Sequence, residues 1–291
     1  MVDAKEAGQK TGRTKTLADR VHSMDRRYMW WFLTILVATM LVIDISIPLK
    51  IGDETKEFVT FMDSFKRGSV ILFSNDNTVT VNNVIGEACT ATMRYLLERG
   101  VKIVFMSLRQ DGVSLTLASL RSIPTVDRFK YGVDYVQFGY YAGDTRVVAA
   151  LQRDVWGTLG ADVRGTACKD IPLMQNIKQC TDFAAWIESG GGSQFTFYIN
   201  NWSVPYNVPG ACIQTAANLP DMTTWYRNRL LNGFVSDQTG SAALSRVLGY
   251  PSGLGRILNA QSAAHVLLIA LILVGNLLYV QEKLRNQRRE K

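Results

Sequence analysis

The sequence predicts an α/β protein, with a Rossmann-like layered parallel sheet in one domain and a transmembrane helix on either side of it. Two long apolar runs, residues 29–49 and 262–280, lie near the two ends of the chain. Between them, short runs that are apolar throughout alternate with helical patterns, which is typical of parallel strands covered on both faces. The roughly 210 residues between the apolar runs are enough for one well-cored domain.

Both apolar runs are long enough to span a bilayer. At about 1.5 Å per helical residue each reaches roughly 28–32 Å, close to the thickness of the hydrocarbon core. Arg26 and Arg27 precede the first run, and five basic residues follow the second: Lys283, Arg285, Arg288, Arg289 and Lys291. By the positive-inside rule both termini are expected in the cytoplasm. We therefore predict a two-pass plasma-membrane protein with cytoplasmic tails at 1–27 and 282–291, transmembrane helices at 28–49 and 262–281, and an extracytoplasmic domain at 50–261.

The positive charge of the chain is concentrated near the expected cytoplasmic face. The formal net charge is +7, yet residues 50–261 carry twenty Lys and Arg against eighteen Asp and Glu. Nucleic-acid binding needs a local cationic stripe, so nucleic acid is excluded as a partner of the outer domain. The basic tails instead suit anionic lipid headgroups, which makes the lipid bilayer itself the first predicted partner.

The outer domain is expected to begin with a helix. Phe58, Phe61, Met62 and Phe65 recur at helical spacing, and Gly68 is a stop signal. Three strand–helix pairs are then predicted: strands at 69–74, 101–106 and 134–138, and helices at 83–99, 111–122 and 145–155. The remaining predicted elements are a helical segment at 182–188, a fourth strand at 195–199, and helices at 220–232 and 240–248.

The outer domain contains no histidine, because the two histidines of the chain are His22 and His265. Catalysis by a Ser-His-Asp or Cys-His arrangement and zinc ligation by histidine are therefore excluded there. The loop after the first predicted strand, residues 74–78, has no glycine with which to cradle a dinucleotide pyrophosphate, and no Walker-type loop is present. We therefore predict no cofactor, and an enzyme is the less favoured class.

One aspartate follows each of the first three predicted strands: Asp76, Asp111 and Asp144. The carboxyl ends of parallel strands share one edge of the sheet, so these side chains could form a ligand site, hold a divalent cation or act as an acid/base pair. Each also precedes a predicted helix or turn, where an aspartate side chain caps free backbone N–H groups. Capping is the preferred interpretation, and whether a metal binds is left open.

All four cysteines lie in the outer domain, where an oxidising compartment would permit disulfides. Cys168 and Cys180 flank a short segment that contains Pro172, which makes them the candidate disulfide pair. Cys89 lies in a helical pattern and is expected to be a buried thiol.

Two stretches of sequence, residues 131–143 (YGVDYVQFGYYAG) and 170–174 (DIPLM), together with Gly275 and Asn276 in the second apolar run, carry a resemblance. The chain resembles uncharacterised two-pass membrane-anchored proteins of bacteria and archaea that have an extracytoplasmic Rossmann-like domain. The resemblance implies a prokaryotic plasma membrane. That group has no assigned reaction, so no residue roles are carried over.

Three classes of function stay open at this point. The first is a non-enzymatic structural or scaffold subunit, whose outer domain mediates association as a homo-oligomer or with another membrane protein. The second is a small-ligand-binding receptor or sensor that uses the edge of the sheet. The third is a metal-assisted enzyme built on the three aspartates. The short tails leave no room for an output domain, which favours the scaffold.

Overall fold

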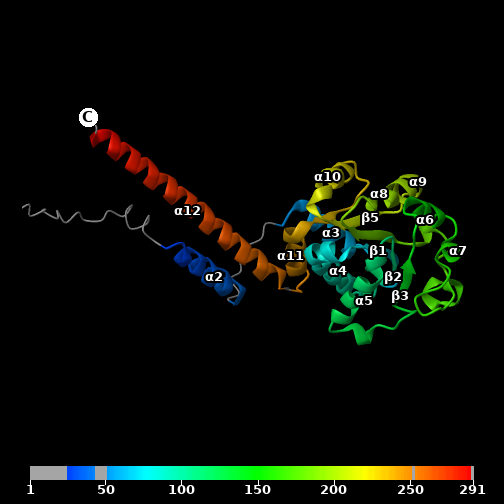
Figure 1. The fold of residues 1–291 in the computed structure, drawn as a ribbon. Helices are drawn as coiled ribbons and strands as arrows, with labels where there is room; N and C mark the ends of the chain where they lie inside the picture. The colour runs from blue at the N-terminus through cyan, green and yellow to red at the C-terminus, as the bar shows by residue number, and fades with distance from the viewer. Residues whose placement is uncertain (1–24, 43–50, 251–252, 290–291) are drawn as a thin grey trace, which may run out of the picture. The chain divides into compact units, whose positions relative to one another are not determined.

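The computed structural model describes residues 25–42, 51–250 and 253–289 (Figure 1). The chain divides into two compact units. One comprises Met1–Ser46 and Arg256–Lys291, and the other comprises Ile47–Gly255. The second unit is the α/β domain, and it holds all the residues discussed below as a site.

A six-stranded parallel sheet forms the centre of the α/β domain, in the order β3-β2-β1-β4-β5-β6. The strands are β1 Val70–Asp76, β2 Lys102–Ser107, β3 Tyr135–Tyr140, β4 Ala185–Gly190, β5 Gly210–Gln214 and β6 Phe234–Ser236. The predicted Rossmann-like parallel sheet is thereby confirmed. The chain runs outward from β1 to β3 and then returns to place β4 on the other side of β1, so the strand order reverses between β1 and β4.

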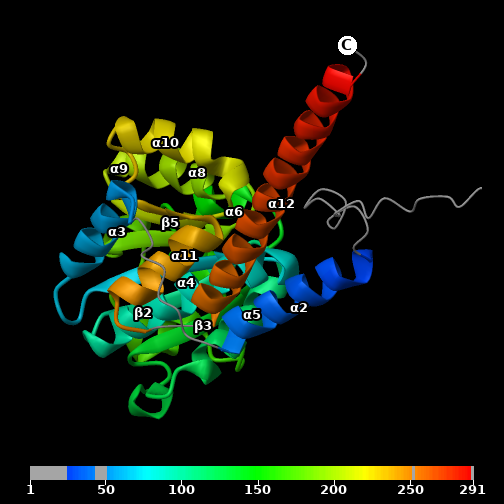
Figure 2. The same cartoon turned by 90° about the vertical axis from the view of Figure 1, so that its left-hand side faces the viewer.

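Helices cover both faces of the sheet (Figures 1 and 2). One face packs against α3 Asp53–Asp63, α4 Val79–Glu98, α5 Gln110–Ser122 and α11 Asp237–Val247. The other packs against α6 Thr145–Ala150, α7 Val155–Leu159, α8 Phe195–Tyr198, the π-helical turn η5 Ile199–Ser203, α9 Val204–Tyr206 and α10 Leu219–Arg227. Short 3-10 turns complete the domain: η1 Val126–Arg128, η2 Cys168–Asp170, η3 Pro172–Met174, η4 Cys180–Asp182 and η6 Ala216–Asn218.

Alternate strand residues point to opposite faces, as the pleat of a strand requires. In β1, Ile71 and Phe73 pack with the α4 side, whereas Leu72 packs with the α8 side. Because both faces are covered, the strands are buried throughout and their sequences are apolar without alternation. This explains why the first three strands were visible in the sequence.

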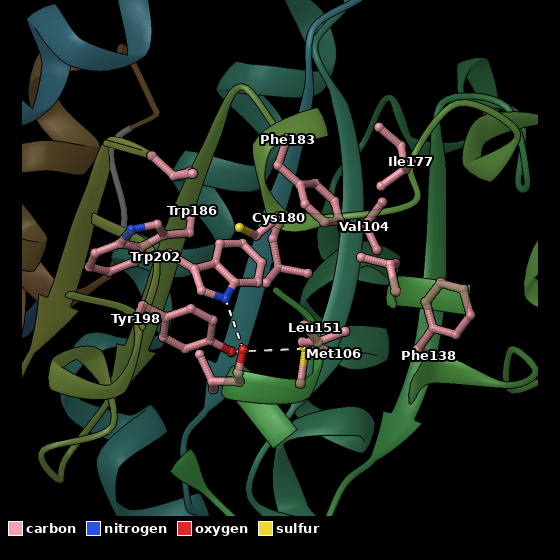
Figure 3. Close-up of a cluster of buried hydrophobic side chains, with 14 of the residues drawn as sticks. Val104, Met106, Phe138, Leu151, Ile177, Cys180, Phe183, Trp186, Tyr198 and Trp202 are labelled. Atoms are coloured by element: carbon pink, nitrogen blue, oxygen red, sulfur yellow. Dashed lines mark hydrogen bonds between the residues drawn. The ribbon is translucent and has the colours of Figure 1, made fainter. Parts of the chain in front are cut away.

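Three aromatic rings from β4, α8 and η5 form the centre of the core on the α8 side (Figure 3). Trp186 stacks on Tyr198 with ring centroids 5.3 Å apart, and Tyr198 meets Trp202 edge-on at 5.5 Å. The indole Nε1 of Trp202 donates to the carbonyl of Val148 at 2.9 Å, which ties η5 to α6. A Cβ at Gly210 would lie 1.9 Å from Cε2 of Trp186, so β5 can pass the ring only with glycine there.

The second half of the domain differs from the prediction. Residues 195–199, predicted as a strand, form α8 and the start of η5. Residues 182–188, predicted as helix, contain the last residue of η4 and the first four residues of β4. Phe195, Tyr198, Ile199 and Trp202 are all fully buried at spacings of three and four residues, which is the pattern of a helix face. The aromatic and β-branched composition of this segment suggested a strand, but burial along one helix face determines its structure. Strands β5 and β6 were not predicted.

Among the described residues, one helix is long and apolar enough to cross a membrane. It is the part Leu254–Gln281 of α12, which extends over Leu254–Arg289. In the first predicted span, α2 covers Arg26–Val42 and is shorter than a full span. The rest of that prediction, residues 43–49, lies outside the described residues, so a second, N-terminal span is not supported by the structure.

Candidate functional site

Polar side chains are buried at the carboxyl ends of β1, β4 and β5, beside the point where the strand order reverses. Ser74 of β1 lies opposite Glu188 of β4, and Gly190 lies between Asp76 of β1 and Gln214 of β5. Residues two apart on a strand share a face, so Ser74, Asp76, Glu188 and Gln214 all lie on the α8 side of the sheet. In open parallel sheets this position is where ligands bind.

Asp76 is almost completely buried, with 2% of its surface exposed. Its carboxylate accepts a hydrogen bond from the Ser74 hydroxyl at 2.9 Å and one from the backbone N–H of Leu108 at 2.5 Å. Burial is the largest influence and raises the pKa of Asp76 from 3.8 to about 7, although these hydrogen bonds and the charge of Arg109 act in the opposite direction.

Glu188 is fully buried on the neighbouring strand. Its Oε2 accepts a hydrogen bond from Nε2 of Gln214 at 2.5 Å, whereas its Oε1 has no hydrogen-bond partner among the described residues. Burial first, and then the nearby charge of Asp76, raise the pKa of Glu188 well above its usual range. A buried acceptor without a partner costs free energy, so this oxygen calls for an explanation.

The two carboxyl groups titrate as a pair because each influences the other. Both pKa values are raised, chiefly by burial, so the fold disfavours the ionised form of each group. The same surroundings act on Tyr198, whose pKa is raised first by burial and then by the charges of Asp76 and Glu188. Tyr198 is therefore a neutral phenol next to the pair. Such a pair can accept a hydrogen bond from a ligand or exchange a proton with it.

Arg109 and Gln194 connect the two loops at the rim of this site. Arg109 is exposed and directly precedes α5, while Gln194 is buried and directly precedes α8. With the amide oxygen of Gln194 turned toward the arginine, that oxygen accepts from Arg109 Nε at 3.1 Å and from Nη2. The positive charge of Arg109 also lowers the pKa values of Asp76 and Glu188, so it acts on the pair that the rim covers.

Three consecutive glycines, at the end of β4 and in the loop that follows it, each lie close to another part of the site. A Cβ at Gly190 would lie 2.6 Å from Oε1 of Glu188 and 3.6 Å from Cβ of Asp76. A Cβ at Gly191 would lie 2.5 Å from Cγ2 of Val81, and one at Gly192 would lie 2.6 Å from Oε1 of Gln194. The unpartnered carboxyl oxygen therefore packs so closely against Gly190 that any side chain at position 190 would displace it.

Behind β1 and β4, on the α4 side, lies a second polar network that is internally satisfied. Ser189 donates to Oδ1 of Asn77 at 3.1 Å and lies 2.8 Å from the thiol of Cys89, and Nδ2 of Asn77 donates to that thiol at 3.5 Å. Burial is the main cause that raises the pKa of Cys89 to about 11, so this thiol is protonated and unreactive. The network holds the two strand ends together and leaves no group for a ligand.

The three sequence-predicted aspartates do not form one site. Asp76 belongs to the buried pair, but Asp111 lies exposed in the first turn of α5, and Asp144 precedes α6 with φ 49°. Within the described ranges, no group of three or more His, Cys, Asp or Glu side chains is arranged to hold a metal ion. Capping does not describe them either, because Thr78 caps α4, and neither α5 nor α6 has a side-chain cap hydrogen bond.

The candidate disulfide is not formed. All four cysteines are buried free thiols, and Cys168 and Cys180 pack as small apolar residues in the core cluster on the α8 side. Burial raises the pKa of Cys168 to about 12 and that of Cys180 to about 11, so both are protonated.

An open groove of about 430 Å³ lies elsewhere, where α3 meets the segment after α10. Its wall carries both signs of charge, from Glu57, Arg227 and Arg229, and these side chains are exposed. Exposed charges of mixed sign are solvated and do not indicate a ligand-binding site. The buried acid pair is the stronger candidate.

Comparison with known proteins adds no family to this description. No family model matches the chain, and neither a curated protein nor a solved structure matches it significantly.

Proposed function

We propose that this protein is a membrane-anchored receptor whose α/β domain binds a small polar ligand at the carboxyl ends of β1, β4 and β5. The observation that carries the proposal is Oε1 of Glu188, a fully buried carboxyl oxygen without a hydrogen-bond partner in the described structure. Leaving such a group unpaired costs roughly 1–3 kcal/mol, more if it is charged. A ligand that donates a hydrogen bond to it would recover this free energy.

The surroundings of Glu188 support a binding role over a purely structural one. The pair lies beside the reversal of strand order, the usual place for ligands in this type of sheet. Few polar groups converge there, from Asp76, Gln214 and Arg109, and a small set of this kind fixes the orientation of a ligand.

The membrane topology is part of the proposal. Leu254–Gln281 would anchor the chain, and the apolar run at 29–49 would form a second span. The basic residues that flank both runs then place both termini in the cytoplasm and the α/β domain outside, at a prokaryotic plasma membrane, as the resemblance to two-pass proteins implies. The receptor would therefore sample solutes outside the cell.

The scaffold hypothesis stays a prediction. Anchoring at two ends would lower the entropic cost of lateral association, either with a second copy or with another membrane protein. No feature of the described domain favours association as specifically as the acid pair favours a ligand, so we rank the receptor first. The metal-assisted enzyme gains no support, because only Asp76 of the three aspartates lies in the buried pair.

Thermal unfolding of the full-length protein in mild detergent tests the proposal. A panel of amino acids, amines, carboxylates and polyols would be added at millimolar concentration. We expect at least one class to raise the Tm, because a ligand that binds only the folded state stabilises it by mass action. The Glu188→Gln variant should lose most of that rise. Asp127→Asn makes the same change from carboxyl to amide at an exposed position in η1 and should keep the rise in Tm. A panel that leaves the Tm unchanged between pH 6 and 8 would refute a receptor for these solutes.

A further inference from the structure

We propose that the ligand is an amino acid in its zwitterionic form, with its amine held by Glu188 and Asp76 and its carboxylate held by Arg109. This inference rests on the proposed function and specifies the class of ligand. It follows from three features: the unpartnered oxygen of Glu188, the buried carboxyl group of Asp76 on the adjacent strand, and the arginine at the rim.

The acid pair selects for an amine. Two carboxyl groups on adjacent strands are buried with no hydrogen bond between them in the described structure, and Oε1 of Glu188 has no hydrogen-bond partner there. A neutral hydroxyl could supply one donor to this oxygen. An ammonium supplies up to three donors and a positive charge, which offsets the mutual repulsion of the two groups. The inner end of the site therefore fits an ammonium best.

Arg109 selects for a carboxylate in the same molecule. Its guanidinium already donates to the amide oxygen of Gln194, and it can donate in the same forked geometry to a carboxylate. Its positive charge acts on both Asp76 and Glu188, so it would also repel a bare amine placed between them. A bare carboxylate, in turn, would be repelled by the acid pair. A molecule that carries both groups avoids both penalties.

Entry of the ligand requires the rim to rearrange. Asp76 and Glu188 have almost no exposed surface, and the contact between Arg109 and Gln194 joins the two loops beside them. The ligand carboxylate would replace the amide oxygen of Gln194 as the acceptor for Arg109. The loop that must move contains Gly191 and Gly192, which give the backbone the freedom to do so.

Calorimetric titration of the full-length protein in detergent, with matched compounds, tests this inference. The amino acids are glycine, 3-aminopropanoate, 4-aminobutyrate and 5-aminopentanoate, which separate amine and carboxylate by increasing lengths. Butylamine and butyrate each lack one of the two groups, and glycerol offers hydroxyls alone. We expect one amino acid to bind at least tenfold more tightly than butylamine and butyrate.

Two variants separate the two halves of the site. Arg109→Gln should abolish the advantage of the amino acid over butylamine, while Glu188→Gln should abolish its advantage over butyrate. Arg128→Gln, at an exposed position in η1, removes the same positive charge and should change neither ratio. If a variant does not fold, as judged by its thermal transition, the comparison of compounds on the wild-type protein still decides the outcome.

The possible failures are distinguishable. If glycerol or another polyol binds and the amino acids do not, the zwitterion is wrong and the receptor stands. If butylamine binds as tightly as the best amino acid and Arg109→Gln has no effect, the role of Arg109 is wrong and the inference falls. If no compound binds, neither the ligand class nor the proposed receptor for such solutes survives.

Discussion

At the scale of single residues, the most informative feature is the carboxyl group of Asp76, whose ionisation is disfavoured by burial in the fold. Asp76 receives two good hydrogen bonds, from Ser74 and Leu108, and burial still raises its pKa to about 7. Glu188 has one oxygen with no partner in the described chain. Stability alone would be served better by neutral side chains at both positions, which is why we attribute the pair to function.

The pair makes the stability of the α/β domain depend on pH in a defined direction. The raised pKa of Asp76 means that, between about pH 4 and 7, the folded state holds a proton that the unfolded state releases. The free energy of unfolding therefore falls as pH rises through this window. One pKa unit corresponds to about 1.4 kcal/mol, so the shift from 3.8 to about 7 corresponds to a loss on the order of 4 kcal/mol between pH 4 and 8.

Denaturant unfolding followed by tryptophan fluorescence in detergent measures this dependence. The Asp76→Asn variant should reduce it, because the amide oxygen can still accept from the N–H of Leu108 but cannot titrate, while Glu188 keeps its raised pKa through burial. Glu188, Arg109 and Tyr198 face the same group and are unchanged in the variant. An equal slope in the two proteins would show that Asp76 ionises normally.

Gly190 can be tested in the same way. Gly190→Ala would place a Cβ 2.6 Å from Oε1 of Glu188, too close for that oxygen to keep its position in the site. We expect a loss of roughly 1–3 kcal/mol in unfolding free energy, as is typical of overpacking, and loss of ligand binding. Gly139→Ala in β3 is the matched control, because a Cβ there has no atom within 4 Å. Equal Tm values for the two variants would contradict the close packing around Gly190.

At the scale of elements, the aromatic cluster holds α8, η5 and α9 against the sheet and so fixes the end of the glycine loop. Trp202 is its central member: it stacks on Phe183 at 5.7 Å and donates to Val148. Trp202→Ala should cost about 3–5 kcal/mol, the usual range for a large buried aromatic. Trp225→Ala, at a half-buried position in α10, should cost clearly less. If Trp202→Ala and Trp225→Ala lower the Tm by similar amounts, the aromatic cluster does not anchor α8 and η5 to the sheet.

The sequence was sufficient for the first three strand–helix units and insufficient for the rest, for physical reasons. Strands β1 and β2 contain the continuous apolar runs 70–73 and 103–106, and β3 is apolar apart from Gln137 and Gly139, so they show the pattern of a strand covered on both faces. Strand β4 contains Glu188 and ends in glycine, which removes that pattern. Strands β5 and β6 are short, and β5 begins with a glycine that the ring of Trp186 requires.

The candidate site was only partly predictable for a related reason. Asp76 could be found because it directly follows an apolar run. Glu188 and Gln214 could not, because their strands were not recognised and because β4 lies next to β1 across a long connection. No local pattern encodes this adjacency. The rim residue Arg109 had a weak signal at most, since one arginine after a strand is common.

At the scale of the whole molecule, the proposed membrane topology determines on which side of the membrane the site lies. Leu254–Gln281 is long and apolar enough to span, and the second span remains part of our proposal. Single cysteines introduced at Asn201, Arg288 and Thr11 can be treated in intact cells with a reagent that does not cross membranes. We expect labelling at 201 alone. The native cysteines are buried, so the background should be low.

The outcomes of this labelling distinguish the topologies. Labelling at 11 together with 201 would show that the first apolar run does not cross the membrane as proposed. Labelling at 288 without 201 would invert the protein and place the site in the cytoplasm.

The contact between Arg109 and Gln194 affects the rates of ligand binding and release as well as the affinity. A ligand that must wait for this contact to break binds more slowly than diffusion would allow, and it leaves slowly for the same reason. Gln194→Ala would increase both the association rate and the dissociation rate of the ligand and would change their ratio, the Kd, less. A receptor that exchanges its ligand slowly responds to the average supply of that solute and ignores brief fluctuations in it.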